Sequence, residues 1–191
     1  PILTEEQLAK VTETVLEPTI QALRERGIDY QGVLYAGLIV SPDGDSKVLE
    51  FNCRFGDPET QAILPLLETP LDEIILACLE QRLDRLPPFQ WSPQKALSVV
   101  AASEGYPGSY EKGKLITGTT QNLDGLVFHA GTRLDEQGRL LTSGGRVLAV
   151  TALGDNFDHA AAKAYRAIAQ IQFSGCYYRS DIGYRVREQE K

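Results

Sequence analysis

Residues 48–61 read VLEFNCRFGDPETQ and join an apolar strand pattern to a dense group of polar side chains. Val48 and Leu49 are typical of a buried strand. Glu50 and Asn52 stand two residues apart, and residues with that spacing in a strand project to the same face. We therefore expect a strand whose polar face ends in a cluster of charged and amide groups.

Turn chemistry between two apolar runs predicts an antiparallel hairpin. The runs cover residues 33–40 and 47–53, and PDGD at residues 42–45 stands between them. Proline, aspartate and glycine in succession favour a tight turn. The strand that carries Glu50 and Asn52 is thus expected to pair with the strand before it.

Helices are expected on both sides of this hairpin. Thr4 and Gln7 fit a capping box at the start of an amphipathic pattern, which Pro18 should kink or restart. Pro58 can occupy the first turn of a helix, because its missing N–H would have no partner there. The expected helices cover residues 4–26, 58–68 and 71–84.

The residue pattern of the sequence changes after a proline-rich segment at residues 87–93. Beyond it, short apolar runs alternate with glycine-rich turns, and Asp155 is a candidate N-cap for a final helix over residues 156–171. The expected strands cover residues 97–102, 126–129 and 146–153. We expect a second, small β-rich module with one helix.

The composition argues against several classes of protein. The 191-residue chain has 19 Lys and Arg against 26 Asp and Glu, a net charge of −7, and lacks the basic stripe that nucleic-acid binding needs. Its three cysteines form no C-x-x-C pair, and no apolar run is long enough to span a membrane. We expect a cytoplasmic protein without nucleic-acid or membrane partners. Because the chain opens at Pro1 and has no methionine, we expect it to be part of a longer product.

Two oxygen-bearing side chains on one strand face suit a hard cation. Mg²⁺ is commonly held by one or two protein groups, with water and substrate phosphates completing its shell. Arg54, further along the same face, would stabilise charge on a transferring phosphoryl group. The alternative is that Glu50 and Asn52 form the solvated face of an amphipathic hairpin. The polar residues up to Gln61 favour the site, because they gather at a strand end and helix start.

The chain resembles the C-terminal part of enzymes of the phosphoribosylamine–glycine ligase family. The members of this family are ATP-grasp enzymes of purine biosynthesis. The resemblance covers nearly the whole chain in the family's order, and RFGDPETQ at residues 54–61 is highly specific. The strings that carry it are YQGVLYAGLIV, LEFNCRFGDPETQ, EGYPGSYEKG, VFHAGT and SGGRVLAVTALG.

The resemblance implies a reaction and a metal site. ATP, glycine and 5-phosphoribosylamine would give glycinamide ribonucleotide, ADP and phosphate, through an acylphosphate that an amine then attacks. Glu50 and Asn52 fall at the positions of the family's Mg²⁺ (or Mn²⁺) ligands, which bridge the metal to the ATP phosphates.

Further roles follow from the resemblance and from proximity in the sequence. Arg54 is expected to contact phosphate or the acylphosphate, and Leu49 to touch the adenine ring. Asp57 and Glu59 are catalytic candidates that would orient Arg54 or the substrate amines. Arg146 follows two glycines in a pattern that suits an anion, and we hypothesise that it lies near phosphoribosylamine or ATP.

We therefore expect an α+β chain in two domains. Residues 1–90 would be the C-terminal part of an ATP-grasp lobe, an antiparallel hairpin plus helices, and residues 91–191 the β-rich module of the ligase. The missing N-terminal part of the same enzyme would be a partner, and the chain alone is expected to be inactive. Two alternatives stay open: a non-catalytic scaffold or interaction fragment, and another ATP-grasp carboxylate–amine ligase.

Overall fold

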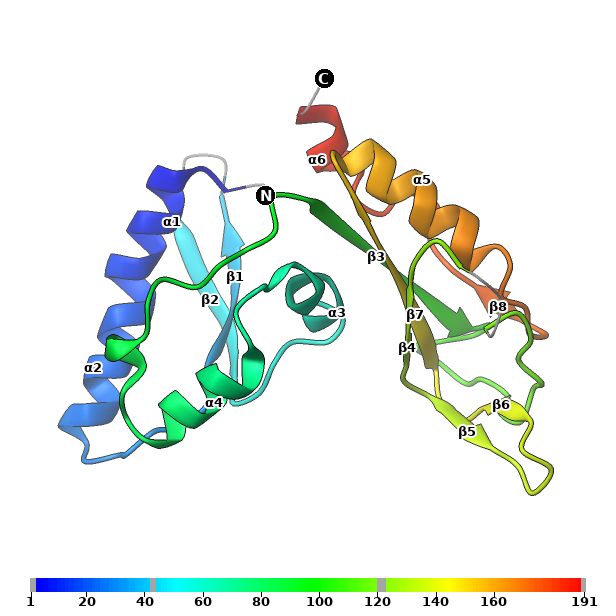
Figure 1. The fold of residues 1–191 in the computed structure, drawn as a ribbon, viewed down its shortest axis with the longest axis horizontal. Helices are drawn as coiled ribbons and strands as arrows, with labels where there is room; N and C mark the ends of the chain where they lie inside the picture. The colour runs from blue at the N-terminus through cyan, green and yellow to red at the C-terminus, as the bar shows by residue number, and fades with distance from the viewer. Residues whose placement is uncertain (1–2, 42–43, 120–122, 190–191) are drawn as a thin grey trace. The chain divides into compact units, whose positions relative to one another are not determined.

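The computed structural model describes residues 3–41, 44–119 and 123–189, which fall into two compact units (Figure 1). The first unit comprises Pro1–Gly56 and Thr69–Gln90, and the second comprises Asp57–Glu68 and Trp91–Lys191. Both contain helices and antiparallel strands, which confirms the predicted α+β class. Across the described residues, no helix combines the length and apolar character that crossing a bilayer requires.

The first unit opens with the predicted helix, divided into three parts. These are α1 (Glu5–Val11), a π-helical segment (Thr12–Leu16) and α2 (Glu17–Glu25). The capping box is confirmed, because Thr4 Oγ1 accepts from Gln7 N at 3.2 Å and Gln7 Oε1 accepts from Thr4 N at 3.0 Å. Pro18 lies in the first turn of α2, where its missing N–H loosens the helical hydrogen bonding. The predicted restart at this proline is confirmed.

The predicted hairpin forms from β1 (Tyr35–Val40) and β2 (Ser46–Asn52). Gly37 pairs with Glu50 and the next residue, Leu38, pairs with Val48, so Leu49 has no partner and forms a β-bulge. Ser41 N donates to Asp45 O at 2.9 Å at the end of the hairpin where the turn joins the two strands. Residues 42–43 of the predicted turn lie outside the described residues.

The helices after the hairpin are shorter than predicted. Thr60–Ile63 forms α3 and Leu71–Leu79 forms α4. Placing Pro58 in the first turn of a helix was wrong, because residues 57–59 form a turn that the contacts of Asp57 hold in place. The helix predicted to reach residue 84 ends at Leu79, because Gln81 adopts the left-handed φ of 53°, which a right-handed helix cannot include.

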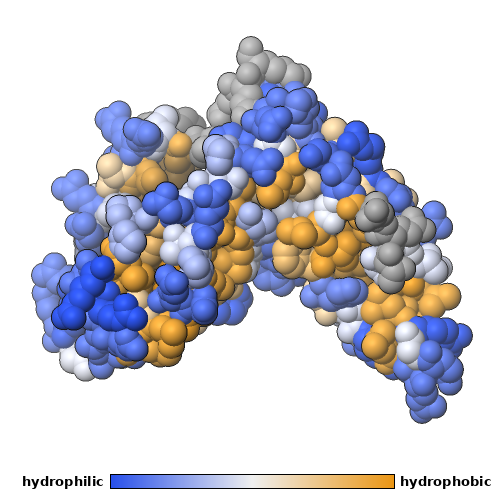
Figure 2. Space-filling view, in the orientation of Figure 1, coloured by the Kyte–Doolittle hydropathy of each residue, from blue (hydrophilic) through white to orange (hydrophobic). Residues whose placement is uncertain are grey.

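The first unit leaves much of its apolar surface exposed. In the described part of this unit only three residues are buried, namely Val11, Gly56 and Ala77. Figure 2 shows apolar side chains among polar ones on the molecular surface. The exposed apolar residues of this unit include four of the hairpin, namely Ile39, Val48, Leu49 and Phe51. A groove of about 570 Å³ runs between α2 and β2. Exposed apolar surface of this extent is typical of an interaction face.

The second unit is built on a four-stranded antiparallel sheet in the order β4-β7-β3-β8. The strands predicted at residues 97–102, 126–129 and 146–153 are confirmed. They correspond to β3 (Lys95–Ser103), β4 (Leu126–His129) and β7 (Arg146–Gly154). Four short elements were not predicted: β5 (Thr132–Leu134), β6 (Leu140–Thr142), β8 (Cys176–Tyr177) and α6 (Tyr184–Gln189).

A helix of small residues closes the core of the second unit. The helix is α5 (Phe157–Ile168), and it packs on β3 and β7. Its buried face consists of alanines and one isoleucine: Ala160, Ala161, Ala164, Ala167 and Ile168. Alanine has the smallest side chain that still favours a helix, so this face lets the helix axis approach the sheet closely. The predicted N-cap, Asp155, was wrong: the cap is Asn156, whose extended backbone lets Oδ1 accept from His159 N at 2.8 Å.

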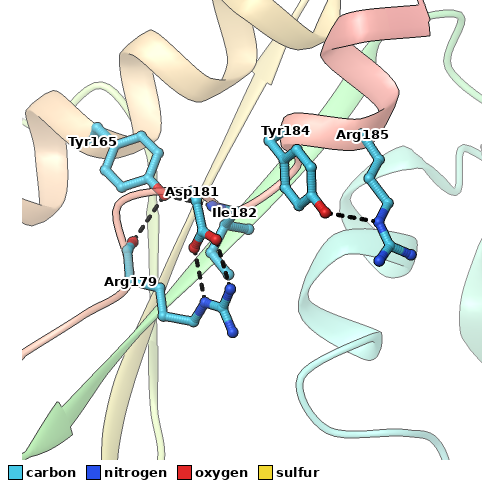
Figure 3. Close-up of polar contacts among 6 residues, drawn as sticks. All are labelled: Tyr165, Arg179, Asp181, Ile182, Tyr184 and Arg185. Atoms are coloured by element: carbon cyan, nitrogen blue, oxygen red, sulfur yellow. Dashed lines mark hydrogen bonds and ion pairs between the residues drawn. The ribbon is translucent and has the colours of Figure 1, made fainter.

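Tyr165 of α5 holds the C-terminal segment (Figure 3). Its hydroxyl donates to Arg179 O at 2.9 Å and accepts from Ile182 N at 3.0 Å. Arg179 in turn binds both carboxylate oxygens of Asp181, at 2.8 and 2.6 Å. These hydrogen bonds hold the pKa of the Asp181 carboxyl below its ordinary value. The loop before α6 is therefore fixed to the helix by backbone and side-chain contacts.

Truncating Leu148, which is fully buried in β7, should destabilise the second unit. The cavity left by Leu148→Ala is expected to lower the free energy of unfolding by about 2–5 kcal/mol. Leu134→Ala, at a side chain that is 65% exposed, is the control and should change it by less than about 0.5 kcal/mol. Urea unfolding followed by the fluorescence of Trp91, the only tryptophan, measures both. Equal effects would contradict the core assignment.

Acid should break the ion pair of Asp181. Because its pKa is lowered in the folded protein, the pair contributes stability above a pH of about 3.9, the ordinary aspartate pKa. That contribution is lost as the pH falls through the lower, folded value. An NMR titration should give Asp181 a depressed pKa, and Arg179→Met should raise it toward the ordinary value. A pKa that does not respond to Arg179→Met would refute this origin of the shift.

Candidate functional site

The bulge in β2 decides which side chains share a face. Val48 and Phe51 both line the groove beside α2, although residues three apart in a regular strand lie on opposite faces. Leu49 has no partner in β1, and this extra residue resets the alternation. Glu50 and Asn52 therefore project from the other face of the hairpin.

Glu50 and Asn52 point together, as their spacing predicts. Asn52 Nδ2 donates to Glu50 Oε1 at 3.0 Å, which directs Asn52 Oδ1 away from the carboxylate. Gly37 stands opposite Glu50 in β1, and a Cβ on this glycine would lie 3.1 Å from Glu50 Cγ. The absence of a side chain at Gly37 thus leaves room for the glutamate.

The donor set of this pair fits Mg²⁺ or Mn²⁺. Within the described residues, Glu50 Oε2 and Asn52 Oδ1 make no hydrogen bond, and both are hard oxygen donors of the type that these cations prefer. No group of three His, Cys, Asp or Glu residues in the described parts of the chain could hold a metal by itself. Water and substrate groups commonly complete the coordination shell of Mg²⁺ beside one or two protein ligands.

A tyrosine supports the end of this strand. Tyr30 donates its hydroxyl to Val33 O at 2.7 Å. A hydrogen bond with Cys53, the residue after Asn52, and then burial raise the pKa of Tyr30. The phenol therefore stays neutral at physiological pH and acts as a structural hydrogen-bonding group beside the site.

Arg54 and Leu49 are the other candidates in the first unit, and both are exposed. Arg54 follows the strand, and its Nη1 donates to Phe55 O at 2.9 Å. The guanidinium has five N–H donors, so this bond leaves others for a ligand. Leu49 is 68% exposed at the bulge, where an apolar side chain is available for a flat ring.

Asp57 and Glu59 belong to the second unit. Asp57 binds Arg146, whose Nη1 donates to Asp57 O at 2.7 Å and whose Nη2 lies 3.2 Å from Asp57 Oδ2. Gln61 Nε2 donates to Asp57 Oδ1 at 3.0 Å. Glu59 is exposed and precedes α3. The structure therefore brings Asp57 together with Arg146, a contact that sequence patterns do not reveal because 89 residues separate the two.

Comparison with known proteins supports the family resemblance. The family model described as phosphoribosylglycinamide synthetase, ATP-grasp (A) domain, matches residues 1–60. The model described as phosphoribosylglycinamide synthetase, C domain, matches residues 96–185. Residues 48–60, which include Glu50 and Asn52, thus fall in the ATP-grasp match, and Arg146 falls in the C-domain match.

Named relatives and a solved structure agree with these matches. The chain is 61% identical to a phosphoribosylamine–glycine ligase of Nostoc sp., over 97% of the chain and 44% of the relative. It is 50% identical to the trifunctional purine biosynthetic protein adenosine-3 of Gallus gallus, over 97% of the chain and 18% of the relative. A crystal structure of phosphoribosylamine–glycine ligase from Thermotoga maritima aligns with a TM-score of 0.84 and 35% identity, over 96% of the chain and 45% of that structure.

The chain spans less than half the length of these relatives. Two domain models of one family match it side by side, and together they extend over most of its sequence. The mixed fold agrees with the solved relative along nearly the whole chain. The chain therefore belongs to the phosphoribosylamine–glycine ligase family and carries sequence of that family's ATP-grasp and C domains.

Proposed function

We propose that the complete protein joins glycine to 5-phosphoribosylamine at the expense of ATP, giving glycinamide ribonucleotide, ADP and phosphate in purine biosynthesis. The observation that carries this proposal is the 61% identity, over 97% of the chain, to a protein named phosphoribosylamine–glycine ligase. The substrates are small and water-soluble, so we place the enzyme in the cytoplasm. The paired oxygens of Glu50 and Asn52 support the use of a metal with ATP.

In this proposal Glu50 and Asn52 hold Mg²⁺ or Mn²⁺ through Glu50 Oε2 and Asn52 Oδ1. The metal, when bound, would neutralise charge on the ATP phosphates. Asn52 Nδ2 keeps Glu50 in position through its 3.0 Å hydrogen bond. The two side chains therefore form one unit, in which the amide both binds and orients.

The remaining candidates act on the substrates. The glycine carboxylate attacks the γ-phosphorus of ATP, ADP leaves, and the amine of phosphoribosylamine then displaces phosphate from the acylphosphate. Arg54 contacts the transferring phosphoryl group, where a fixed guanidinium stabilises developing charge. Leu49 contacts the adenine ring, and Glu59 orients a substrate amine. Asp57 is a catalytic candidate by sequence, but its carboxylate is already bound by Arg146 and Gln61.

The rest of the site lies in the other part of the longer protein. The chain spans 44% of its Nostoc relative, and the first unit exposes Val48 and Phe51 in the groove beside α2. We propose that residues 1–90 contribute one part of the ATP-grasp domain and that residues 91–191 form the C-terminal module. The exposed apolar face of the first unit is then covered by the missing N-terminal part of the same enzyme.

Activity should require the complete protein and all three substrates. Phosphate release by the full-length enzyme should depend on ATP, glycine and phosphoribosylamine together, and the isolated 191-residue chain should show none. Adding the upstream part of the protein in trans should restore release, because it supplies the other wall of the site. A full-length protein that binds partners but never turns over these substrates would instead favour a scaffold.

Removing the charge of Glu50 should sharply reduce turnover while leaving the fold intact. Glu50→Gln in the complete enzyme is expected to lower kcat/KM by about 100-fold or more, since even outer-shell changes at metal sites cost 10–100-fold. Glu73→Gln, at an exposed position of α4, is the matched control and should retain wild-type rates. Steady-state kinetics across a range of Mg²⁺ concentrations measures both variants. A wild-type rate in Glu50→Gln would remove this residue from the metal site.

A further inference from the structure

Arg146 contacts one residue, Asp57, through both terminal nitrogens of its guanidinium. Nη1 donates to the backbone oxygen of Asp57 at 2.7 Å, and Nη2 lies 3.2 Å from Asp57 Oδ2. The other carboxylate oxygen accepts from Gln61 Nε2 at 3.0 Å. Gln61 Oε1 is buried and has no hydrogen-bond partner among the described residues. The hydrogen bond from Gln61 Nε2 to Asp57 therefore sets the orientation of the Gln61 amide. The turn before α3 is thus tied to β7 by backbone and side chain together.

The strand that carries Arg146 is fixed at this position by a second β-bulge. In the pairing of β3 with β7, Ala101 faces Leu148 and Ala102 faces Arg146, which leaves Val147 without a partner. Val147 and Leu148 are both buried, as are the residues that follow them up to Ala152, so the core packs against both faces of this strand. The arginine therefore emerges at a point where the core determines the direction of the backbone.

The glycines before Arg146 lie in close contact with neighbouring residues, which restricts the backbone at the start of β7. A Cβ on Gly145 would lie 2.1 Å from the Tyr106 ring, and one on Gly144 would lie 2.9 Å from Gly131 Cα. Gly131 N donates to Arg146 O at 2.9 Å. Close backbone contact of this kind requires glycine, and it makes the start of β7 a rigid base for the guanidinium.

We infer that Arg146 is a positioning residue of the ligase, which acts by holding Asp57 and the turn at residues 57–59 rather than by touching substrate. This inference rests on the proposed function, because it assigns the turn to the active enzyme. The turn continues the stretch that carries Glu50 and Asn52. A guanidinium is suited to the task, since its planar fork binds a carbonyl and a carboxylate at the same time.

The first test measures how the two residues depend on each other in the complete enzyme. Arg146→Met should lower kcat by about 10- to 100-fold, the range expected when catalytic geometry shifts by about 1 Å. The KM values for ATP, glycine and phosphoribosylamine should change by less than about twofold, because no ground-state contact is lost. Asp57→Asn should cost less than this, since Asp57 O still accepts from Arg146. The double variant Asp57→Asn/Arg146→Met should be no slower than Arg146→Met.

A direct contact between Arg146 and a substrate would give a different result. If Arg146 touches phosphoribosylamine or ATP, Arg146→Met should raise the KM of that substrate, and its cost should multiply with that of Asp57→Asn. Either result overturns the positioning role. Arg139→Met is the control, because Arg139 also pairs with an aspartate, Asp135, beside the short β5–β6 pair; it should retain wild-type kinetics.

A second measurement uses the 191-residue chain itself and needs no activity. Arg146→Met should speed amide hydrogen exchange at residues 60–63 of α3, whereas Arg139→Met should leave it unchanged. Unchanged exchange in Arg146→Met would overturn the inference even if the enzyme slowed. The activities of the wild-type enzyme and of Glu50→Gln show whether a failed test concerns the positioning role of Arg146 or the proposed function. If the wild type is inactive the function fails, whereas an active wild type with a fully active Arg146→Met removes only the positioning role.

Discussion

One unpaired residue, Leu49, determines how the first unit presents its chemistry. The bulge it creates in β2 allows Val48 and Phe51 to share the groove beside α2, and it leaves Glu50 and Asn52 together on the other face. Without the bulge, strict alternation would place Phe51 on the face opposite Val48. A local irregularity in hydrogen bonding thus makes it possible for one short strand to carry both a packing face and a polar pair.

The parts of the structure that could be predicted are those with local causes. Thr4 and Gln7 satisfy each other within one turn, and the spacing of Glu50 and Asn52 alone places them side by side. One prediction failed because a distant contact decides the outcome. The turn at Pro58 is set by Asp57 and its bond to Arg146, and no periodicity reports on a partner so far along the chain. Short strands such as β5 were missed because three residues carry too little pattern.

The two units differ in how much of their apolar surface they bury. The second has a continuous core in which the alanine face of α5 meets β3 and β7. In the first, only Val11, Gly56 and Ala77 are buried among the described residues, and the hairpin presents apolar side chains. Because area removed from water is the main stabilising term in folding, the first unit gains less stability from its own described residues than the second does. The chemistry proposed for Glu50 and Asn52 therefore sits on the less self-sufficient unit.

The backbone passes between the units more than once, since Asp57–Glu68 belongs to the second unit while the segments on either side of it belong to the first. Neither unit is therefore a contiguous stretch of polypeptide. A gene fragment beginning at Trp91 would encode the sheet and α5 but would omit Asp57, leaving the Arg146 guanidinium without its carboxylate. A boundary drawn at Trp91 would therefore divide the second unit, because it separates Arg146 from the residue that its guanidinium contacts.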